Sequence, residues 1–191
     1  MRKIWIGLVK LFGWRFEVPS LEERPELLHC VVAVAPHTSF KDFFVGPAVL
    51  FSVGANPRIF MKKEYFNFIT RPLLNYFGVV EVDRGNRHND MVGSAVRLLK
   101  EQQNACVVVT PEATRKPVKR FKRGFYEIAT QAGVPIVLGY MDFKKKVAGY
   151  GPTIVPSGDY EADFQKMIEF FAPVNAADPK GWYYGAGNNE M

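Results

Sequence analysis

His37 and Asp42, two residues of types that act together in catalysis, lie five positions apart in the stretch VVAVAPHTSFKD, residues 31–42. A histidine can take a proton near neutral pH, and a carboxylate bound to its second ring nitrogen fixes the tautomer and stabilises the imidazolium. In the other interpretation, Asp42 only accepts from backbone N–H groups at a helix start and His37 is a surface loop residue. These residues alone leave both interpretations open.

The sequence on either side of the pair predicts how the two residues are positioned. Residues 31–34 are apolar and mostly β-branched, as expected of a buried strand, and Pro36 cannot donate to a central ladder. His37 should therefore stand at the mouth of the strand. Ser39 is predicted to be the N-cap of the next helix, with Asp42 in its first turn, where a carboxylate can turn back toward the histidine.

The composition indicates a folded, basic protein. The chain has 191 residues, of which 48% are hydrophobic, and a formal charge of +6. This length suits one domain with a substantial core. The charge favours an anionic partner, but does not choose among phosphate esters, acidic lipid, an acidic carrier protein and nucleic acid. Cys30 and Cys106 lie beside apolar runs without metal-ligand spacing, so we interpret them as buried thiols, which suit a reducing cytosol.

The first sixteen residues predict an amphipathic helix with Lys3, Gly7 and Lys10 on its polar face. The opposite face holds Ile4, Trp5, Leu8, Val9, Leu11 and Phe12. Such a helix either packs on the domain or anchors the protein at a membrane interface, and the cations and two tryptophans, Trp5 and Trp14, favour the anchor. No targeting signal is expected, because Lys10 interrupts the apolar run. The longest uncharged stretch, residues 43–57, is too short for an ordinary membrane-spanning helix.

Strand-like and helix-like segments alternate along the rest of the chain. Strands are predicted at residues 30–35, 58–61, 78–82, 105–109, 135–142 and 147–151, and helices at 39–51, 89–103, 123–133 and 160–171. We expect the first of these helices to bend or restart at Gly46-Pro47. The alternation predicts an α/β fold with a central, mostly parallel sheet flanked by helices. The predicted organisation is an amphipathic interfacial helix at 1–16, a main domain at 17–172 and a tail at 173–191.

Residues 63–77 contain more aromatic and aliphatic side chains than one narrow helical stripe requires. Such a segment is usually part of a core. The alternative is that it lines a channel for a long apolar ligand.

Polar residues follow three of the predicted strands. His37, Arg84 and the loop with Glu112 and Arg115 each come just after a strand, and ligands gather at the carboxyl ends of parallel strands. Guanidinium groups bind phosphate through two hydrogen bonds, so Arg84 and Arg115 are candidate phosphate ligands. The lysine-rich run at 116–124 either focuses an anionic substrate or is a solvated basic loop.

The stretch HTSFKD at 37–42 resembles the His-x4-Asp motif of the glycerolipid acyltransferases, the family that contains 1-acylglycerol-3-phosphate acyltransferase. Three later blocks follow in the family's order. They are GVVEVDR at 78–84, PEATR at 111–115 and VPIV at 134–137. The resemblance covers about residues 30–140 and implies a glycerolipid acyltransferase-like fold, with 17–172 as an acyltransferase domain.

By that resemblance, His37 is the general base, Asp42 orients it, and the acceptor phosphate site contains Arg84, Glu112, Thr114 and Arg115. Two residues depart from the family pattern. Pro36 replaces an asparagine that often precedes the histidine, and Ala113 replaces a glycine. Glycine adopts a positive φ readily and alanine does not, so the replacement puts such a conformation at 113 in doubt. A change of acceptor, rather than a loss of activity, is the milder consequence.

A direct transfer is expected, because no G-x-S-x-G elbow occurs and neither cysteine is placed like an activated thiol. His37 would take the proton of an acceptor hydroxyl, which then attacks the thioester carbonyl of acyl-CoA or acyl carrier protein. Backbone N–H groups at the turn into the helix are expected to stabilise the oxyanion. The thiol leaves readily enough to need no metal, and no cofactor is expected.

The resemblance implies acylation of a lysolipid such as 1-acylglycerol-3-phosphate in phospholipid biosynthesis. We therefore expect a cytoplasmic protein that is peripheral on the anionic inner face of the membrane. A phosphate-free lyso-aminolipid is an alternative acceptor, and water is another if His37 serves a hydrolase. A basic membrane- or nucleic-acid-binding module without catalysis is the remaining alternative, although no nucleic-acid motif occurs.

Overall fold

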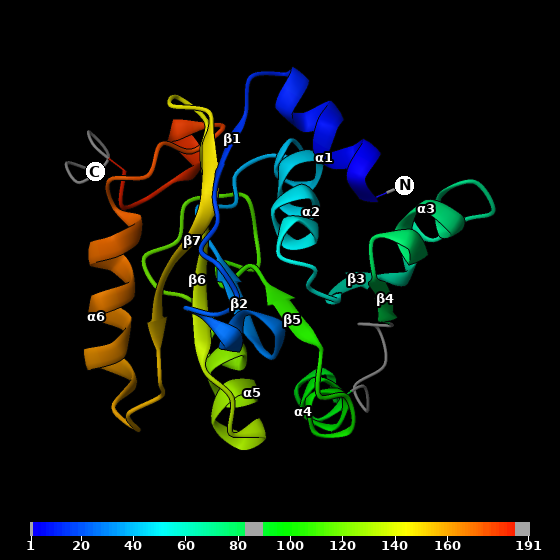
Figure 1. Ribbon diagram of the computed structural model, residues 1–191. Coiled ribbons are helices and arrows are strands. Elements are labelled where there is room, and N and C mark those ends of the chain that lie inside the picture. Colours follow the sequence, from blue (N-terminus) through cyan, green and yellow to red (C-terminus); the bar gives the residue numbers. More distant parts are fainter. Residues whose placement is uncertain (1, 83–89, 186–191) are drawn as a thin grey trace.

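The computed structural model describes residues 2–82 and 90–185. Within them, seven strands form one sheet in the order β1-β7-β6-β2-β5-β3-β4 (Figure 1). The strands are β1 (Arg15–Glu17), β2 (Cys30–Val34), β3 (Pro57–Lys62), β4 (Val79–Val82), β5 (Cys106–Val109), β6 (Ile136–Asp142) and β7 (Val147–Ile154). All neighbours run parallel except β6 and β7, which form an antiparallel hairpin. The predicted α/β fold with a mostly parallel sheet is confirmed.

Helices cover both faces of the sheet (Figure 1). They are α1 (Arg2–Leu11), α2 (Asp42–Ser52), α3 (Thr70–Tyr76), α4 (Met91–Glu101), α5 (Gly124–Ala132) and α6 (Tyr160–Phe171). Because side chains alternate along a strand, Val31 and Ala33 of β2 join the core under α4, α5 and α6. Cys30 and Val32 join the core under α1 and α2. The central strand β2 is therefore buried on both faces.

The helix after β2 begins later than the sequence predicts. Lys41 rather than Ser39 occupies the N-cap position. The carboxylate of Asp42 accepts from the N–H groups of Thr38 and Ser39, each at 3.1 Å, and so holds residues 38–41 in a turn ahead of the helix. The predicted restart at Gly46-Pro47 is also absent from the described chain, because α2 continues through Pro47 to Ser52.

The N-terminal helix is shorter than the predicted segment 1–16. It ends at Leu11, Gly13 takes a φ of 85°, and Arg15–Glu17 then joins the sheet beside β7. Trp14, which the sequence assigns to the anchor, is buried against the ring of Phe143. The segment is therefore a helix followed by an edge strand.

The apolar residues of α1 divide between two surfaces. Val9 is fully buried, and the ring nitrogen of Trp5 donates to the carbonyl of Phe44 in α2 at 3.1 Å. The helix is thus packed on the domain. Ile6 is partly buried on the same side, whereas Ile4, Leu8 and Leu11 of the helix and Phe12 just after it are exposed. Within residues 2–82 and 90–185, none of the helices combines the length and apolarity needed to cross a membrane.

The apolar residues of the segment 63–77 are also divided between the core and the surface. Leu74 and Phe77 belong to the core, whereas Phe68 and Ile69 are 94% and 83% exposed. Phe66 also packs on this core, whereas Leu73 is 53% exposed, so the core interpretation holds for only part of the segment. Cys30 and Cys106 are buried free thiols as predicted, and their sulfurs lie 3.8 Å apart across β2 and β5.

Candidate active site

The structure brings His37 and Asp42 together. His37 Nδ1 lies 2.9 Å from Asp42 Oδ2, because residues 35–41 leave β2 and fold back over the first turn of α2. Asp42 is 4% exposed, while His37 is partly exposed. When Nδ1–H donates to the buried carboxylate, Nε2 is the ring nitrogen that can accept a proton. The pair therefore has the geometry of a histidine base with its orienting carboxylate.

Glu112 binds the backbone of the loop that carries His37. It is 3% exposed, and its two carboxylate oxygens lie 3.0 and 3.1 Å from the backbone nitrogen of His37, whose N–H donates to them. Burial raises the pKa of Glu112 to about 7 in spite of these hydrogen bonds. The contact seen is with the backbone of His37, and a role in the acceptor phosphate site stays a prediction.

These two carboxylates change one expectation of the sequence analysis. The N–H of His37 donates to Glu112, and those of Thr38 and Ser39 donate to Asp42. The N–H groups of residues 37–39 are therefore already engaged. An oxyanion site formed by other N–H groups of this turn stays a prediction. The sequence offered the hydrogen bonds from backbone N–H groups to Asp42 and its pairing with His37 as alternatives, and the structure shows both together.

The loop after β5 carries the other predicted residues. Ala113 adopts a φ of 57°, the conformation that its replacement of glycine put in doubt. An L-residue in this conformation costs roughly 1–2 kcal/mol, so the surrounding loop must hold it. Thr114 accepts from the N–H of Lys116 at 3.2 Å. The guanidinium carbon of Arg115 lies 3.6 Å from the centre of the Phe40 ring, a cation–π contact.

Arg84 lies outside the described residues. The strand before it, β4, is at the edge of the sheet, and its carboxyl end points the same way as those of β2 and β5. The basic run at 116–124 is partly structural. Arg120 and Arg123 lie 3.2 and 2.8 Å from the carboxylate of Glu161 on α6.

A cavity of about 920 Å³ opens beside His37 and Asp42. Its polar end also has Thr114 and Arg115 in its lining. Beyond them the lining is mainly apolar and includes Phe43, Pro47, Leu50, Ile59, Met61, Leu73 and Leu74. A site with convergent polar groups at one end and apolar walls beyond suits an amphiphilic molecule. The excess of apolar residues at 63–77 was the sequence signal for this lining.

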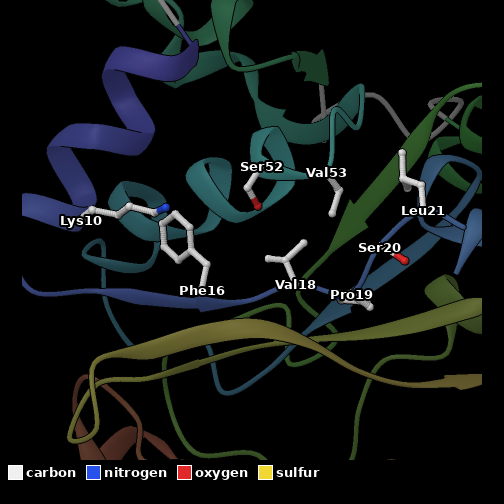
Figure 2. Close-up of a pocket in the computed structure, with 8 residues that line it drawn as sticks. All are labelled: Lys10, Phe16, Val18, Pro19, Ser20, Leu21, Ser52 and Val53. Atoms are coloured by element: carbon white, nitrogen blue, oxygen red, sulfur yellow. The ribbon is translucent and has the colours of Figure 1, made fainter. Parts of the chain in front are cut away.

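A second cavity, of about 360 Å³, lies between the end of α1, residues 16–21 and the end of α2 (Figure 2). Its polar side chains are engaged within the protein. Lys10 Nζ lies 5.7 Å from the centre of the Phe16 ring, and the hydroxyl of Ser52 donates to the carbonyl of Val49 at 2.6 Å. It offers no base beside a carboxylate, so the cavity at His37 is the candidate active site. Among the described residues, no three His, Cys, Asp or Glu side chains lie close enough to hold a metal ion.

Comparisons with known proteins agree with this geometry. The profile of the Acyltransferase family matches residues 15–140. The fold is similar to the crystal structure of PlsC, the 1-acyl-sn-glycerophosphate acyltransferase of Thermotoga maritima, with a TM-score of 0.63 and 21% identity. That similarity covers 88% of this chain and 73% of the other. No curated protein sequence matches the chain. The family match runs from β1 into β6 and includes the loops that carry His37 and Arg115, and the chain belongs to the Acyltransferase family.

Proposed function

We propose that this protein transfers a fatty acyl group from a thioester donor to the hydroxyl of a lysolipid such as 1-acylglycerol-3-phosphate. The observation that carries the proposal is the pair of His37 and Asp42 at the polar end of a largely apolar cavity. Family membership supports acyl transfer, and the volume and apolar lining of the cavity support a substrate with a long hydrocarbon chain. The donor is acyl-CoA or acyl carrier protein, and no cofactor takes part.

In this mechanism, Nε2 of His37 accepts the proton of the acceptor hydroxyl as its oxygen attacks the thioester carbonyl. Asp42 stabilises the imidazolium through Nδ1. The tetrahedral intermediate collapses, the C–S bond breaks, and the imidazolium returns its proton to the departing thiolate. General-base assistance of this kind contributes about 10²- to 10⁴-fold. The ester product and the free thiol account for every atom.

Arg115 is the proposed ligand of the acceptor phosphate. Among the described residues that line the cavity, the cations are Arg115 and Lys122. The cation–π contact with Phe40 restrains the guanidinium while leaving its N–H groups for a phosphate. By family resemblance, Arg84, Thr114 and Glu112 belong to the same site. A phosphate-free lyso-aminolipid would use the cavity but not this cation.

The exposed residues of α1 are the proposed membrane contact. Ile4, Leu8, Leu11 and Phe12 present an apolar surface, and Lys3 and Lys10 are exposed on the same helix. Apolar contact and cations together give reversible binding to an anionic surface. We propose that the protein acts there as a peripheral enzyme of phospholipid biosynthesis on the cytoplasmic side.

The catalytic assignment is tested by His37→Ala with labelled acyl-CoA, acyl carrier protein and a panel of lysolipids. We expect turnover to fall at least about 100-fold with the fold intact, because a partly exposed loop histidine supplies proton transfer rather than core volume. His29→Ala, outside the cavity, is the matched control and should keep near-wild-type turnover. Retention of a third of the activity by His37→Ala would show the assignment to be wrong. Release of free fatty acid without an acceptor would indicate a hydrolase.

The acceptor is tested by Arg115→Ala and Arg115→Lys with phosphorylated and phosphate-free lysolipids. A lost charge-assisted contact of about 1.5–3 kcal/mol should lower kcat/KM roughly 10- to 100-fold for the phosphorylated acceptor alone. Arg115→Lys should keep only part of the wild-type kcat/KM, because lysine lacks the planar pair of donors. Equal losses with both acceptors would mean that Arg115 acts through its contact with Phe40 and not on phosphate.

A further inference from the structure

Residues 173–185, here called the C-terminal strap, follow α6 and lie beyond the segment that matches the family. In Figure 1 the strap is red and lies beside the turn between β6 and β7. Its first part is tied to that turn, since the amide of Asn175 donates to Asp142 at 2.8 Å and the N–H of Phe143 donates to Asn175. Its last part is anchored by Trp182, which is 2% exposed in the core under α5 and α6.

Between these anchors the strap contacts the loop that carries His37. The N–H of Asp178 donates to the hydroxyl of Thr38 at 2.9 Å. Thr38 is itself buried, and its own N–H donates to Asp42 Oδ2, the oxygen that binds His37. One residue therefore links the strap to the carboxylate of the catalytic pair.

The strap also touches the loop that carries Arg115. A Cβ atom on Gly181 would lie 2.9 Å from the carbonyl oxygen of Arg115 and 3.0 Å from both Cβ and Cγ2 of Thr38. The distance to the Arg115 oxygen is shorter than a Cβ atom tolerates, so glycine at 181 allows the backbone of Arg115 and the side chain of Thr38 to lie this close to the strap. Further along, the hydroxyl of Tyr184 donates to the carbonyl of Lys119. The strap thus meets both loops at the polar end of the cavity.

We propose that the C-terminal strap positions the active site, with Thr38 and Gly181 as the positioning residues that hold the His37 loop against the Arg115 loop. The inference rests on the proposed function, in which His37 and the acceptor phosphate must be held in register. A displacement of about 1 Å in such a site costs roughly 100-fold in rate. The strap acts through Asp42 and the two loops and does not itself touch the substrate.

The first test compares Gly181→Ala with Thr38→Val, which keeps the shape of threonine but removes the acceptor of the Asp178 N–H. In both, we expect kcat per folded molecule to fall at least about tenfold, with KM for the acyl donor within about twofold. Thr38→Ser keeps the hydroxyl and should remain close to wild type. Gly78→Ala is the destabilised control, because its Cβ would lie 2.0 Å from the carbonyl oxygen of Pro57, outside the cavity lining. It should lower Tm without changing kcat per folded molecule.

The second test does not depend on turnover. The Nδ1–H proton of His37, held by Asp42, should give a downfield proton resonance that is absent from His37→Ala. We expect this resonance to broaden or disappear in Gly181→Ala and Thr38→Val and to persist in Thr38→Ser and Gly78→Ala. If the wild type acylates no lysolipid, the proposed function fails. The resonance still tests whether the strap holds His37 in place against Asp42. Unchanged resonance in both Gly181→Ala and Thr38→Val, or kcat within twofold of wild type, would overturn the positioning role.

Discussion

Glu112 shows how a single buried side chain can couple the loop that carries His37 to pH. Its carboxylate is almost wholly buried and accepts twice from one backbone N–H, that of His37. Burial raises its pKa to about 7, so the group changes charge near neutrality while bound to the backbone of the proposed base. The residue type was visible in the sequence, but its burial depends on the pairing of β2 with β5 and on the loops that follow them.

Glu112 should make stability decrease as pH rises. Its pKa in the fold, about 7, exceeds the ordinary value of 4.5. Its stabilising contribution is therefore complete below about pH 4.5 and is lost as pH rises through about 7. Glu112→Gln stays neutral and can still accept from the N–H of His37. In urea denaturation, the free energy of unfolding of the variant should rise relative to that of the wild type between pH 5 and pH 8, by up to about 3 kcal/mol.

The control for this prediction is Glu127→Gln, an exposed carboxylate in the first turn of α5. Its free energy of unfolding should differ from that of the wild type by a small and nearly constant amount between pH 5 and pH 8. A pH-independent difference for Glu112→Gln would contradict the raised pKa.

At the scale of elements, α6 is joined to α5 through one buried acid. Asp163 Oδ2 accepts from the hydroxyl of Tyr126 and from the N–H and hydroxyl of Ser157, each at 2.8 Å. Lys166 lies 3.1 Å from the other oxygen. Burial alone would raise the pKa of Asp163, but the hydrogen bonds from Ser157 and Tyr126 outweigh it and lower the pKa to about 2.

Asp163→Asn should therefore destabilise the fold by about 2 kcal/mol at pH 7. Because the folded pKa lies below the ordinary 3.8, this contribution is present above about pH 4 and is lost as pH falls toward about 2. Chemical denaturation from pH 7 to pH 2 should show the free energies of unfolding of the variant and the wild type becoming equal. Glu169→Gln, on the exposed side of the same helix, is the control and should stay near wild type throughout. A difference that persisted at pH 2 would mean that Asp163 acts through packing instead.

Elements with a strong local pattern could be predicted from the sequence. The apolar runs of β2, β5 and β6 and the periodicity of α4 are local properties, and the structure has all four close to the predicted ranges. The three-residue strand β1 could not be predicted, because its only support is a partner in β7 far along the chain. The start of α2 was missed because the Asp42 carboxylate reorganised the turn before it. The contact of Asp178 with Thr38 has no local signal at all.

At the scale of the whole molecule, the exposed side of α1 provides the membrane prediction. Deleting residues 1–16 would remove Val9 and Trp14 from the core, so substitutions are the cleaner test. A triple variant, Ile4→Ser with Leu11→Ser and Phe12→Ser, should abolish sedimentation with anionic vesicles. Each aliphatic contributes up to about 1.5–3 kcal/mol if fully buried in the bilayer. Activity on a short-chain, soluble acceptor should be unaffected.

The control for the membrane test is Val155→Ser, which removes an exposed aliphatic from the end of the β6–β7 hairpin. It should leave vesicle binding unchanged. High salt should weaken wild-type binding only in part, because the apolar contribution is not screened. If the triple variant still sedimented, the contact would lie elsewhere, and the exposed Phe68 and Ile69 would be the next residues to change.

The parallel pairing of β1 with β7 also has a consequence for the order of folding. Arg15 pairs with Val147, and Lys146 donates to the carbonyl of Phe12, 134 positions earlier. During synthesis at about 5–20 residues per second, the first strand therefore waits on the order of ten seconds for its partner. Closing such a distant ladder is slow, because the entropy of the long loop is lost before the contacts form. Among the described strands, β7 is the last to be synthesised, so β1, the first to leave the ribosome, cannot pair until all the others have been made.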